Sequence, residues 1–453
     1  MIEIVEIPPS LHLSISPSLY LSPPPYPRSI RKKTNYNEKQ NETCVNGMTA
    51  VAVIIFLLTY AGVAIGDVPK LKLDRTGIAL LGAIAMAVAG IVPLDQLNVA
   101  IDLPTLLLLY ALMVVSAQLQ LGGFYTWTAL RITLLVQRPR LFLWIMMVTS
   151  ALLSALLAND IICLAFTPVL TVALLSAQMN PLPFLLGLAV SSNIGSAATI
   201  IGNPQNMLIG QAGRLHFGAF VAWCTPPALL SLGLAYLLLA WVYRGRFTQQ
   251  TLPSTPCVND WPAFNRWQSV KGIALTVVLI SLFFTSIPRE LSAMTVAGVL
   301  LCSRELHSRS KLELIDWHLI TLFCGLFVVI HGLSVVNVPA YLIAMLDHYG
   351  IALGNLYILT GVSTVLSNLV SNVPATMLLI QFLERANPIP WYALAVSSTF
   401  AGNLITIGSI ANLIVIEQAK RYGVEITFAE HARTGIPITL LSLVVLVGWI
   451  YIT

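Results

Sequence analysis

Long apolar runs separated by short polar stretches fill the chain from about residue 48 to its end. We place these runs near residues 49–66, 76–93, 103–121, 141–158, 161–179, 182–212, 217–243, 271–287, 291–303, 317–336, 351–370, 373–383, 391–416 and 434–452. The runs are continuous rather than alternating, which indicates helices and excludes a membrane β-barrel. Several are too short to cross a hydrocarbon core of about 30 Å, and others are interrupted by Gly, Asn, Ser and Pro. The pattern predicts an all-α polytopic membrane protein.

Composition narrows the class further. Of 453 residues, 57% are hydrophobic and only 9% are charged, whereas soluble domains carry about 25% charged residues. This number of charged residues is too small to cover the surface of a soluble globule. Almost any soluble enzyme, nucleic-acid binder or disordered protein is therefore excluded. The net charge of +5 comes from basic residues in short loops, where they set orientation in the membrane and do not indicate nucleic acid as a partner.

Residues 1–47 differ from the rest of the chain, because they are rich in Pro and Ser and carry a basic run from Arg28 to Lys33. They predict a disordered or mis-annotated N-terminal extension without a signal peptide, and Met48 is a plausible true start. The remaining chain divides into a first repeat over 48–243, a cytoplasmic linker over 244–270 and a second repeat over 271–453.

Basic residues cluster in five loops, which predicts the orientation of the chain. They are Lys70, Lys72 and Arg75; Arg131, Arg138 and Arg140; Arg244, Arg246, Arg266 and Lys271; Arg304, Arg309 and Lys311; and Lys420 and Arg421. All five loops fall on one side if 141–179 is a re-entrant hairpin and the hairpin over 351–383 enters from the opposite side. We take the basic side as cytoplasmic, which predicts a multi-pass protein of the plasma (inner) membrane.

The two halves of the chain contain the same motif. Residues 190–206 align without gaps on 396–412: Val-Ser-Ser opens both, and Ile-Gly with an Asn four residues later closes both. Upstream, Asn159 takes the place of Asn372. Each half therefore has about five transmembrane helices plus a re-entrant hairpin and a broken helix, and the loop charges place the halves in opposite orientations. Such an inverted repeat is typical of secondary transporters, which bind substrate near the membrane midplane.

The breaks have suitable chemistry for a binding site. Half-helices that meet at a break expose free N–H groups, which attract anions, and free carbonyl groups, which coordinate sodium together with Asn and Ser oxygens. We expect Asn203, before Pro204, and Ser409 to cap two of the half-helices. We expect Asn159 and Asn372 to cap the others at the hairpin tips. The candidate substrate- and ion-binding residues are Asn159, Asp160, Ser192, Asn193, Gly195, Thr199, Gly202, Asn203, Asn206, Ser371, Asn372, Pro374, Thr399, Asn403, Thr406, Gly408 and Asn412.

Sodium, if it binds, is expected near Asn159, Asn193, Asn372 and Asn403. The glycines Gly195, Gly202, Gly402 and Gly408 are expected to allow turns and close approach of backbones. Two alternatives stay open from the residues alone: the small residues of 191–202 could form only a helix-packing face, and Asp160 could only cap a helix or reach to the interface.

These residues resemble a known family. The run Ser-Asn-Ile-Gly-Ser-Ala-Ala-Thr-Ile-Ile-Gly-Asn-Pro-Gln-Asn over 192–206 is similar to the hallmark broken helix of the ion transporter superfamily. That group includes arsenite permeases, NhaD-type sodium/proton antiporters, citrate transporters and sodium-coupled divalent-anion symporters. The tips at 158–160 and 371–374 lie where the family has paired Asn-containing tips. The Asn-Asp tip is closer to the arsenite permease and NhaD branch than to dicarboxylate symporters, which typically have Ser-Asn-Thr at both tips.

The resemblance covers residues 48–453 and implies a homodimer with a scaffold domain and a moving transport domain that holds the hairpins and broken helices. We expect a secondary active transporter of a small anion, such as an inorganic oxyanion, arsenite or a carboxylate, coupled to a sodium or proton gradient. The alternatives are an NhaD-type sodium/proton antiporter and an ion channel. An enzyme would need a cluster of acid, base or metal-ligand residues, and the sequence does not contain a recognisable one. We expect no cofactor beyond the coupling ion. A nucleotide-binding motif is missing from the sequence, so ATP could act only through a separate ATPase partner.

Overall fold

The computed structural model of the protein describes residues 28–66, 73–247, 262–349 and 352–453, and this part of the chain contains helices and no strands. The helices of the first half are α1 (Arg28–Ile65), α2 (Arg75–Val88), η1 (Leu94–Gln96), α3 (Leu97–Ala100), α4 (Leu103–Leu121), α5 (Phe124–Thr133), α6 (Pro139–Leu156), α7 (Asn159–Ser176), α8 (Leu182–Ser196), α9 (Pro204–Ala212) and α10 (Phe217–Val242). Those of the second half are α11 (Arg266–Leu282), α12 (Arg289–Leu301), α13 (Ser308–Leu312), α14 (Trp317–Val335), α15 (Val338–His348), α16 (Leu356–Val370), α17 (Asn372–Leu379), η2 (Ile380–Phe382), α18 (Ile389–Ala401), η3 (Thr406–Gly408), α19 (Ile410–Arg421) and α20 (Phe428–Ile452).

Helix α1 corrects one expectation. It begins at Arg28, so residues 28–47 of the expected disordered extension are helical and continue into the apolar run. This stretch contains Lys, Glu and Gln, which are good helix formers, and the apolar helix that follows supplies turns onto which it propagates. Residues 1–27 lie outside the described residues.

Seven helices among the described residues are long and apolar enough to cross a membrane. They are the Gly47–Ile65 part of α1 and the helices α4, α6, α7, α10, α14 and α20. Their outer faces carry many exposed large apolar side chains, such as Leu58, Leu237 and Val444, which suits contact with lipid. The predicted all-α polytopic membrane fold is therefore confirmed.

The two halves repeat the same order of elements. Helices α4 and α14 both have 19 residues, and each is capped by an aspartate, Asp102 or Asp316. Each is followed later by a hairpin, α6–α7 or α16–α17, then by a broken helix, α8–α9 or α18–α19, and then by a long helix, α10 or α20. The predicted hairpins and broken helices are thus all present, and the runs over 182–212 and 391–416 break at the aligned motif.

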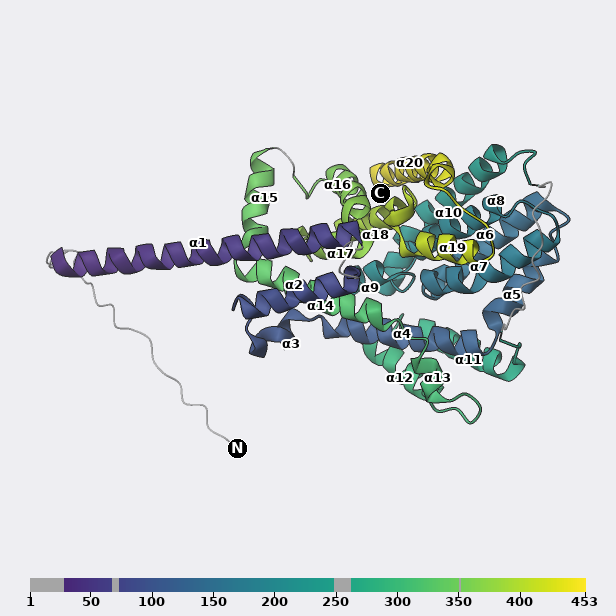
Figure 1. Cartoon of the computed structure of the whole chain (residues 1–453), viewed down its shortest axis with the longest axis horizontal. Helices are drawn as coiled ribbons and strands as arrows, with labels where there is room; N and C mark the ends of the chain where they lie inside the picture. Colours follow the sequence, from purple (N-terminus) through teal and green to yellow (C-terminus); the bar gives the residue numbers. More distant parts are fainter. Residues whose placement is uncertain (1–27, 67–72, 248–261, 350–351) are drawn as a thin grey trace, which may run out of the picture. The chain divides into compact units, whose positions relative to one another are not determined.

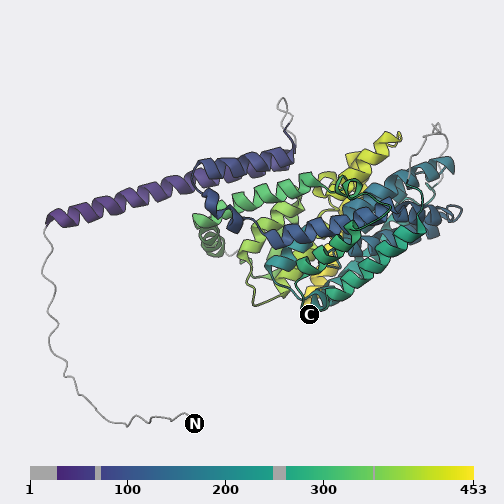
Figure 2. The same cartoon turned by 90° about the horizontal axis from the view of Figure 1, so that it is seen from below.

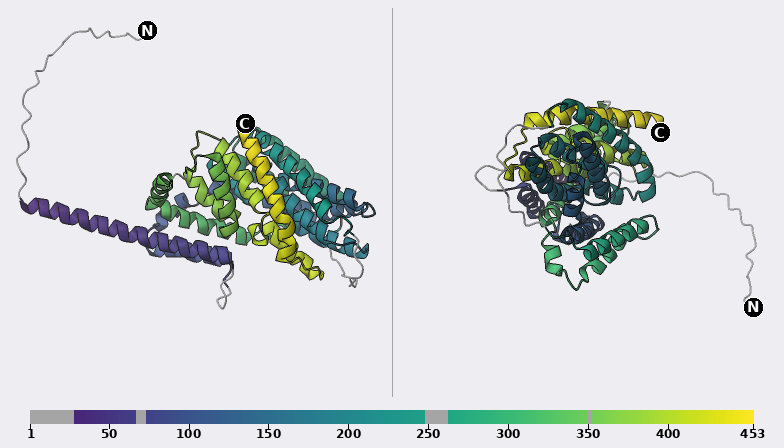
Figure 3. Two further views of the ribbon diagram at one scale, coloured as in Figure 1. Left: turned by 90° about the horizontal axis from the view of Figure 1, so that it is seen from above. Right: turned by 90° about the vertical axis from the view of Figure 1, so that its right-hand side faces the viewer.

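The repeats pack reciprocally into two groups of helices. In the first, which we call the scaffold bundle, α2 packs on α14 and α12 packs on α4, with α11 beside α4; Figure 1 shows α12 and α11 next to α4. In the second, the core bundle, α6 packs on α8 in the same way as α16 packs on α18, and α7 packs on α19. The long helix α20 packs on α10, and the yellow and teal ribbons lie together in the left view of Figure 3, whereas in the view from below in Figure 2 other helices lie in front of α20. The two bundles touch where α9 meets α4 and where α17 meets α14.

Loops that the charge pattern predicts on one side contact one another. Thr76 donates to the carbonyl of His318, Asn265 donates its backbone N–H to the carbonyl of Gly122, and the Asn180 side chain donates to the carbonyl of Arg246. Apart from Asn180, which lies between α7 and α8, these residues lie in or beside the loops that carry the basic residues. Residues from 99–104, 211–217, 283–290 and 380–385, which lie outside the five basic loops, line one pocket together.

Candidate functional site

A small cavity of about 20 Å³ lies where four helices begin. It is lined by the first residues of α7, α9, α17 and α19 and the residues next to them: Asn159, Asp160, Pro204, Gln205, Ser371, Asn372, Val373, Ser409 and Ile410. Two of these helices come from each repeat. Because free N–H groups and the positive end of the helix dipole lie at each N-terminus, four positive helix ends converge on the cavity. Its volume suffices for one water molecule or ion.

Two of the four helix starts are capped as predicted. Asn203 accepts a hydrogen bond from the N–H of Asn206 at the start of α9, and Pro204 occupies the first turn. Ser409 accepts from the N–H of Ala411 at the start of α19. Both caps have extended backbone, so the chain enters each helix sharply from the break. The other N–H groups of each first turn have no helical partner, and Pro204, Gln205, Ser409 and Ile410 at these two starts line the cavity.

The prediction that Asn159 and Asn372 cap the hairpin tips is wrong by one residue. Ala158 and Ser371 occupy the N-cap positions and neither makes a capping hydrogen bond. The asparagine side chains reach across to the broken helices instead. Nδ2 of Asn159 donates to Oδ1 of Asn193 at 3.2 Å. With its nitrogen turned toward the nearby carbonyls, the Asn372 amide donates to Gly408 at 3.0 Å and to Ser398 at 3.1 Å.

The second hairpin tip has an unusual backbone. Ser371 has φ 75° and ψ 159°, a region that residues other than glycine rarely adopt. At the first tip, Ala158 has ordinary dihedral angles. Backbone strain of this kind costs of order 1–3 kcal/mol and persists only where the surroundings impose it. The strain at Ser371 marks the second tip as a place that the fold holds against the local preference of the chain.

Asn193 connects the two repeats behind the cavity. Its Nδ2 donates to Oδ1 of Asn403 at 2.8 Å and to Oδ1 of Asn412 at 3.2 Å. Its Oδ1 accepts from Asn159 and, at 2.9 Å, from Oγ of Ser409. Asn193 is 1% exposed, so these four hydrogen bonds replace water completely. Asn193 and Asn403 therefore hold the walls together, while Asn159 and Asn372 line the cavity itself.

The aligned motifs form matching hydrogen bonds. Asn206 donates to the carbonyls of Ser196 and Thr199, and Asn412 donates to the carbonyls of Gly402 and Ile405. Every one of these positions in the first motif aligns with its partner in the second. The amides satisfy carbonyl groups that the breaks leave without helical partners. Each break is therefore stabilised in the same way, by an asparagine amide that donates to two carbonyl groups of its own motif.

Glycines at the breaks allow close approach, as expected, although none of Gly195, Gly202, Gly402 and Gly408 has positive φ. A Cβ on Gly195 would overlap the backbone of Ala151, and one on Gly202 would overlap the backbone of Ser196. In the second motif the nearest neighbours are side chains: those of Asn372 and Ser409 at Gly402, and that of Asn368 at Gly408, with backbone carbonyls slightly farther away. The first break is therefore closed by backbone contact, and the second by side chains.

The other candidate residues support the breaks from behind. Ser192 donates to the carbonyl of Asn159 at 3.1 Å, and Thr199 donates to the carbonyl of Ala155. Thr399 accepts from Asn203 at 3.2 Å. Pro374 offers its carbonyl to the Tyr60 hydroxyl at 3.1 Å. Half-buried Thr406 begins η3 and does not line the cavity.

Sequence reasoning missed Gln205 as a lining residue. Its counterpart in the second motif is Ala411, so a search for polar residues shared by both motifs passes over it. Gln205 donates to Oγ1 of Thr399 at 3.4 Å, across the repeat interface. The Asn-Pro-Gln-Asn spacing places it in the first turn of α9, and this was the signal that could have identified it.

The charge in the cavity comes from one side chain. Asp160 is the only charged residue among those that line it, and it forms no ion pair with any described residue. Oδ1 of Asn159 is buried and accepts no hydrogen bond from the described residues. A carboxylate and an amide oxygen without a donor, beside Ser and backbone groups, form a set that fits a sodium ion or a proton on the carboxylate. The absence of a basic lining side chain disfavours a multiply charged anion.

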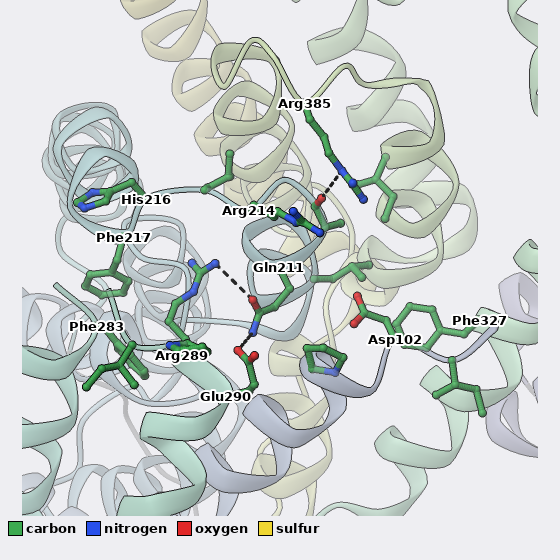
Figure 4. A pocket seen from close by; sticks show the side chains of 18 of the residues that line it. Asp102, Gln211, Arg214, His216, Phe217, Phe283, Arg289, Glu290, Phe327 and Arg385 are labelled. Carbon is green, nitrogen blue, oxygen red and sulfur yellow. Dashed lines mark hydrogen bonds between the residues drawn. The ribbon is translucent and has the colours of Figure 1, made fainter. Parts of the chain in front are cut away.

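A second and larger pocket of about 1000 Å³ lies at the other end of α9 and α17 (Figure 4). We call it the Arg214 pocket. Its walls come from both bundles and include Asp102, Arg289 and Phe327 of the scaffold bundle and Gln211 of the core bundle. Leu208 lines this pocket and Gln205 lines the small cavity. One turn of α9 therefore separates the two spaces, a rise of about 5 Å.

Comparisons with known proteins agree with this architecture. Residues 51–401 match the family model described as citrate transporter. The chain is 30% identical over 423 residues to a 46 kDa membrane protein of Mycobacterium leprae, covering 87% of this chain and 96% of that protein. It is 29% identical over 444 residues to the silicon efflux transporter LSI3 of Oryza sativa subsp. japonica, covering 83% and 92%. The fold is similar to the crystal structure of the YdaH transporter of Alcanivorax borkumensis, with a TM-score of 0.52 and 14% identity over 89% of this chain and 96% of that one.

Proposed function

The chain belongs to the citrate transporter family and is a multi-pass membrane transporter, and we propose that it is a secondary active transporter of a small oxyacid or anion coupled to a sodium or proton gradient. The observation that carries the proposal is the convergence of four helix N-termini on one cavity that contains a single carboxylate. The N–H ends attract the oxygens of a substrate. The cavity of about 20 Å³ holds one ion in the conformation described, so the helix ends must move apart before a substrate enters. Asp160 supplies the place for the coupling ion.

The coupling role follows from the cost of burying charge. A carboxylate within a membrane protein is unfavourable by several kcal/mol unless a cation or a proton neutralises it. Asp160 is half-buried and has no ion-pair partner among the described residues. A sodium ion or a proton therefore binds together with substrate or in exchange for it.

The substrate class follows from the remaining lining groups. Amide and hydroxyl groups of Asn159, Gln205, Ser371 and Asn372 both donate and accept hydrogen bonds, which suits a molecule with several hydroxyl or oxo groups. The relative from rice is named a silicon efflux transporter, and a weak, largely uncharged oxyacid fits a site without a basic side chain. A tricarboxylate would bring several negative charges to Asp160.

One observation favours a second candidate function, an NhaD-type sodium/proton antiporter. The cavity of about 20 Å³ has room for one ion and not for an organic anion. In this alternative Asp160 exchanges a proton for sodium, and no other substrate is moved.

The test uses purified full-length protein in proteoliposomes. Silicate, arsenite, citrate and sulfate are offered in turn under an imposed sodium or proton gradient, and sodium/proton exchange is followed with a pH dye in the absence of these solutes. The proposal predicts gradient-driven movement of at least one oxyacid or anion, abolished by Asp160→Asn and unaffected by Asp95→Asn, which changes an exposed carboxylate. Exchange without movement of any of the four solutes would favour the antiporter. Equal activity of Asp160→Asn and the parent protein would exclude the coupling role.

We also propose that the basic loops face the cytoplasm of a plasma membrane, because the Lys and Arg residues gather on that side. Single cysteines at Ser308, Arg214 and His348 in a cysteine-free background test this orientation. An impermeant thiol reagent should label the positions of Arg214 and His348 in intact cells and should label that of Ser308 only after lysis. The reverse pattern would invert the orientation, and equal labelling of all three would contradict it.

A further inference from the structure

Hydrogen bonds in the Arg214 pocket join the two bundles. Nη2 of Arg289, at the start of α12, donates to the carbonyl of Gly210 at 2.7 Å and to Oε1 of Gln211 at 3.3 Å. Nε2 of Gln211 donates to Oε2 of Glu290 at 3.0 Å, and Figure 4 shows both contacts of the Gln211 side chain. Because α9 belongs to the core bundle and α12 to the scaffold bundle, movement of one bundle past the other must break these bonds. We call Arg289, Glu290 and Gln211 the Arg289 bridge.

The Arg289 bridge contacts the C-terminal end of α9, where a positive charge is most favourable. The last carbonyls of a helix lack helical partners and carry the negative end of its dipole. Arg289 supplies a positive charge and two donors there, and it is half-buried between the bundles. Hydrogen bonds from a charged donor in such partly dry surroundings are stronger than neutral ones in water.

The opposite end of the same helix forms a wall of the small cavity. Helix α9 has nine residues, which gives a stiff segment of about 14 Å. Pro204 and Gln205, at its first turn, line the cavity, and Gln211, at its last turn, is held by the bridge. A rigid displacement of the C-terminal end of α9 therefore also moves Pro204 and Gln205 in the cavity wall.

We propose that Arg289 is a positioning residue that holds α9 against the scaffold bundle and stabilises the conformation seen here, and that transport requires the Arg289 bridge to open. The inference rests on the proposed transport function in one respect only, namely that the bundles move relative to one another. The new element is the contact that determines the populations of the two conformations. A hydrogen bond that is present in one conformation and absent in the other shifts the free-energy difference between them by the free energy of that bond.

The chain offers a matched control at the same helix end. Nε of Arg385 donates to the carbonyl of Ala212 at 3.0 Å. Arg385 lies in the connection between η2 and α18, within the core bundle, so this bond caps α9 without crossing between bundles. Loss of Arg385 removes a cap from α9, whereas loss of Arg289 removes both a cap and a link to the scaffold.

The test measures the distance between the bundles directly and needs no substrate. Spin labels are placed at Ile287, an exposed residue before α12, and at Ala386, an exposed residue before α18, in a cysteine-free full-length chain in nanodiscs. Electron–electron resonance gives the distance distribution for the parent and for Arg289→Gln, Gln211→Ala and Arg385→Gln. We expect Arg289→Gln to raise the ratio of the second distance population to the first about tenfold, which is the effect of losing one charged hydrogen bond.

Gln211→Ala keeps the bond from Arg289 to Gly210 and should shift the ratio in the same direction by less, and it serves as the test if Arg289→Gln does not yield folded protein. Arg385→Gln should leave the distribution as in the parent. An unchanged distribution in both bridge variants, or an equal shift in Arg385→Gln, would overturn the inference. Because the distances do not depend on solute uptake, failure of the liposome assay would reject the proposed function without moving this result.

Discussion

The two central asparagines of the first repeat should respond very differently to replacement by alanine. Asn193 makes four hydrogen bonds inside the protein, whereas Asn159 makes one with its side chain, and its buried Oδ1 accepts none from the described residues. We therefore expect Asn193→Ala to destabilise the fold. We expect Asn159→Ala to abolish transport and to leave the stability of the fold nearly unchanged. The difference separates residues that hold the site from residues that form it.

The size of the effect follows from the partners left behind. Asn193→Ala removes the donor to Asn403 and Asn412 and the acceptor for Asn159 and Ser409. Each buried polar group without a partner costs about 1–3 kcal/mol, and water that enters the space left by the amide recovers part of this. Four groups at the low end of that range give a loss of about 4 kcal/mol. Asn159→Ala breaks a single bond and should cost about 1 kcal/mol.

Unfolding titrations with SDS in mixed detergent micelles measure the free energy of unfolding for both variants, and proteoliposome transport measures activity. Asn98→Ala, which changes an exposed asparagine of α3, provides the matched control and should leave both quantities unchanged. The reasoning would be refuted if Asn193→Ala and Asn159→Ala lost equal stability, or if Asn159→Ala kept normal transport. The second result would also remove Asn159 from the proposed site.

Three further predictions concern the backbone and one buried charge. Ser371→Gly should raise the free energy of unfolding by about 1 kcal/mol in the same titration, because glycine adopts the dihedral angles of Ser371 without strain, and a loss of stability would contradict the strain. Gly202→Ala should cost about 1–3 kcal/mol through overlap with neighbouring backbone, whereas Gly233→Ala, with open space around it, should cost almost nothing. Burial, and secondly the charge of Lys271, lowers the pKa of Lys311, so the unfolded state binds more protons between that lowered pKa and the ordinary value near 10.4. Stability should therefore rise with pH across this interval, and Lys311→Met should flatten the rise; identical pH profiles would contradict it.

The repeat could be predicted from the sequence because its polar residues act locally. Asn206 and Asn412 satisfy carbonyls within their own motifs, ten or fewer positions away. The Asn203 and Ser409 caps act on the next turn of helix. Such short-range pairings depend on spacing alone, and spacing is visible in the chain. The aligned motifs, the breaks and the two caps were accordingly found correctly.

The errors arose where a side chain bonds across the fold. Asn159 and Asn372 are residue types that often cap helices, but each bonds to the broken helix of its own repeat, more than 25 positions along the chain, and the N-cap position is the preceding residue. Arg289 was not singled out at all, because its acceptor at Gly210 lies in the other repeat. Nothing local in the sequence distinguishes such residues from ordinary loop arginines or caps.

One position breaks the symmetry of the site. The motifs place equivalent helix ends on both sides of the cavity, but the residue after the tip asparagine is Asp160 in the first repeat and Val373 in the second. A cation or proton is therefore attracted to the α7 side, while the N–H ends of α17 and α19 face a side without negative charge. In the proposed transporter, the coupling ion would bind beside the carboxylate of Asp160, and the oxygens of the substrate would bind at the positive helix ends of the other side. We expect exchange of the two residues, in the double variant Asp160→Val and Val373→Asp, to restore part of the gradient dependence that Asp160→Val alone removes. Complete inactivity of the folded double variant would show that the two helix pairs, although related by the repeat, are not interchangeable.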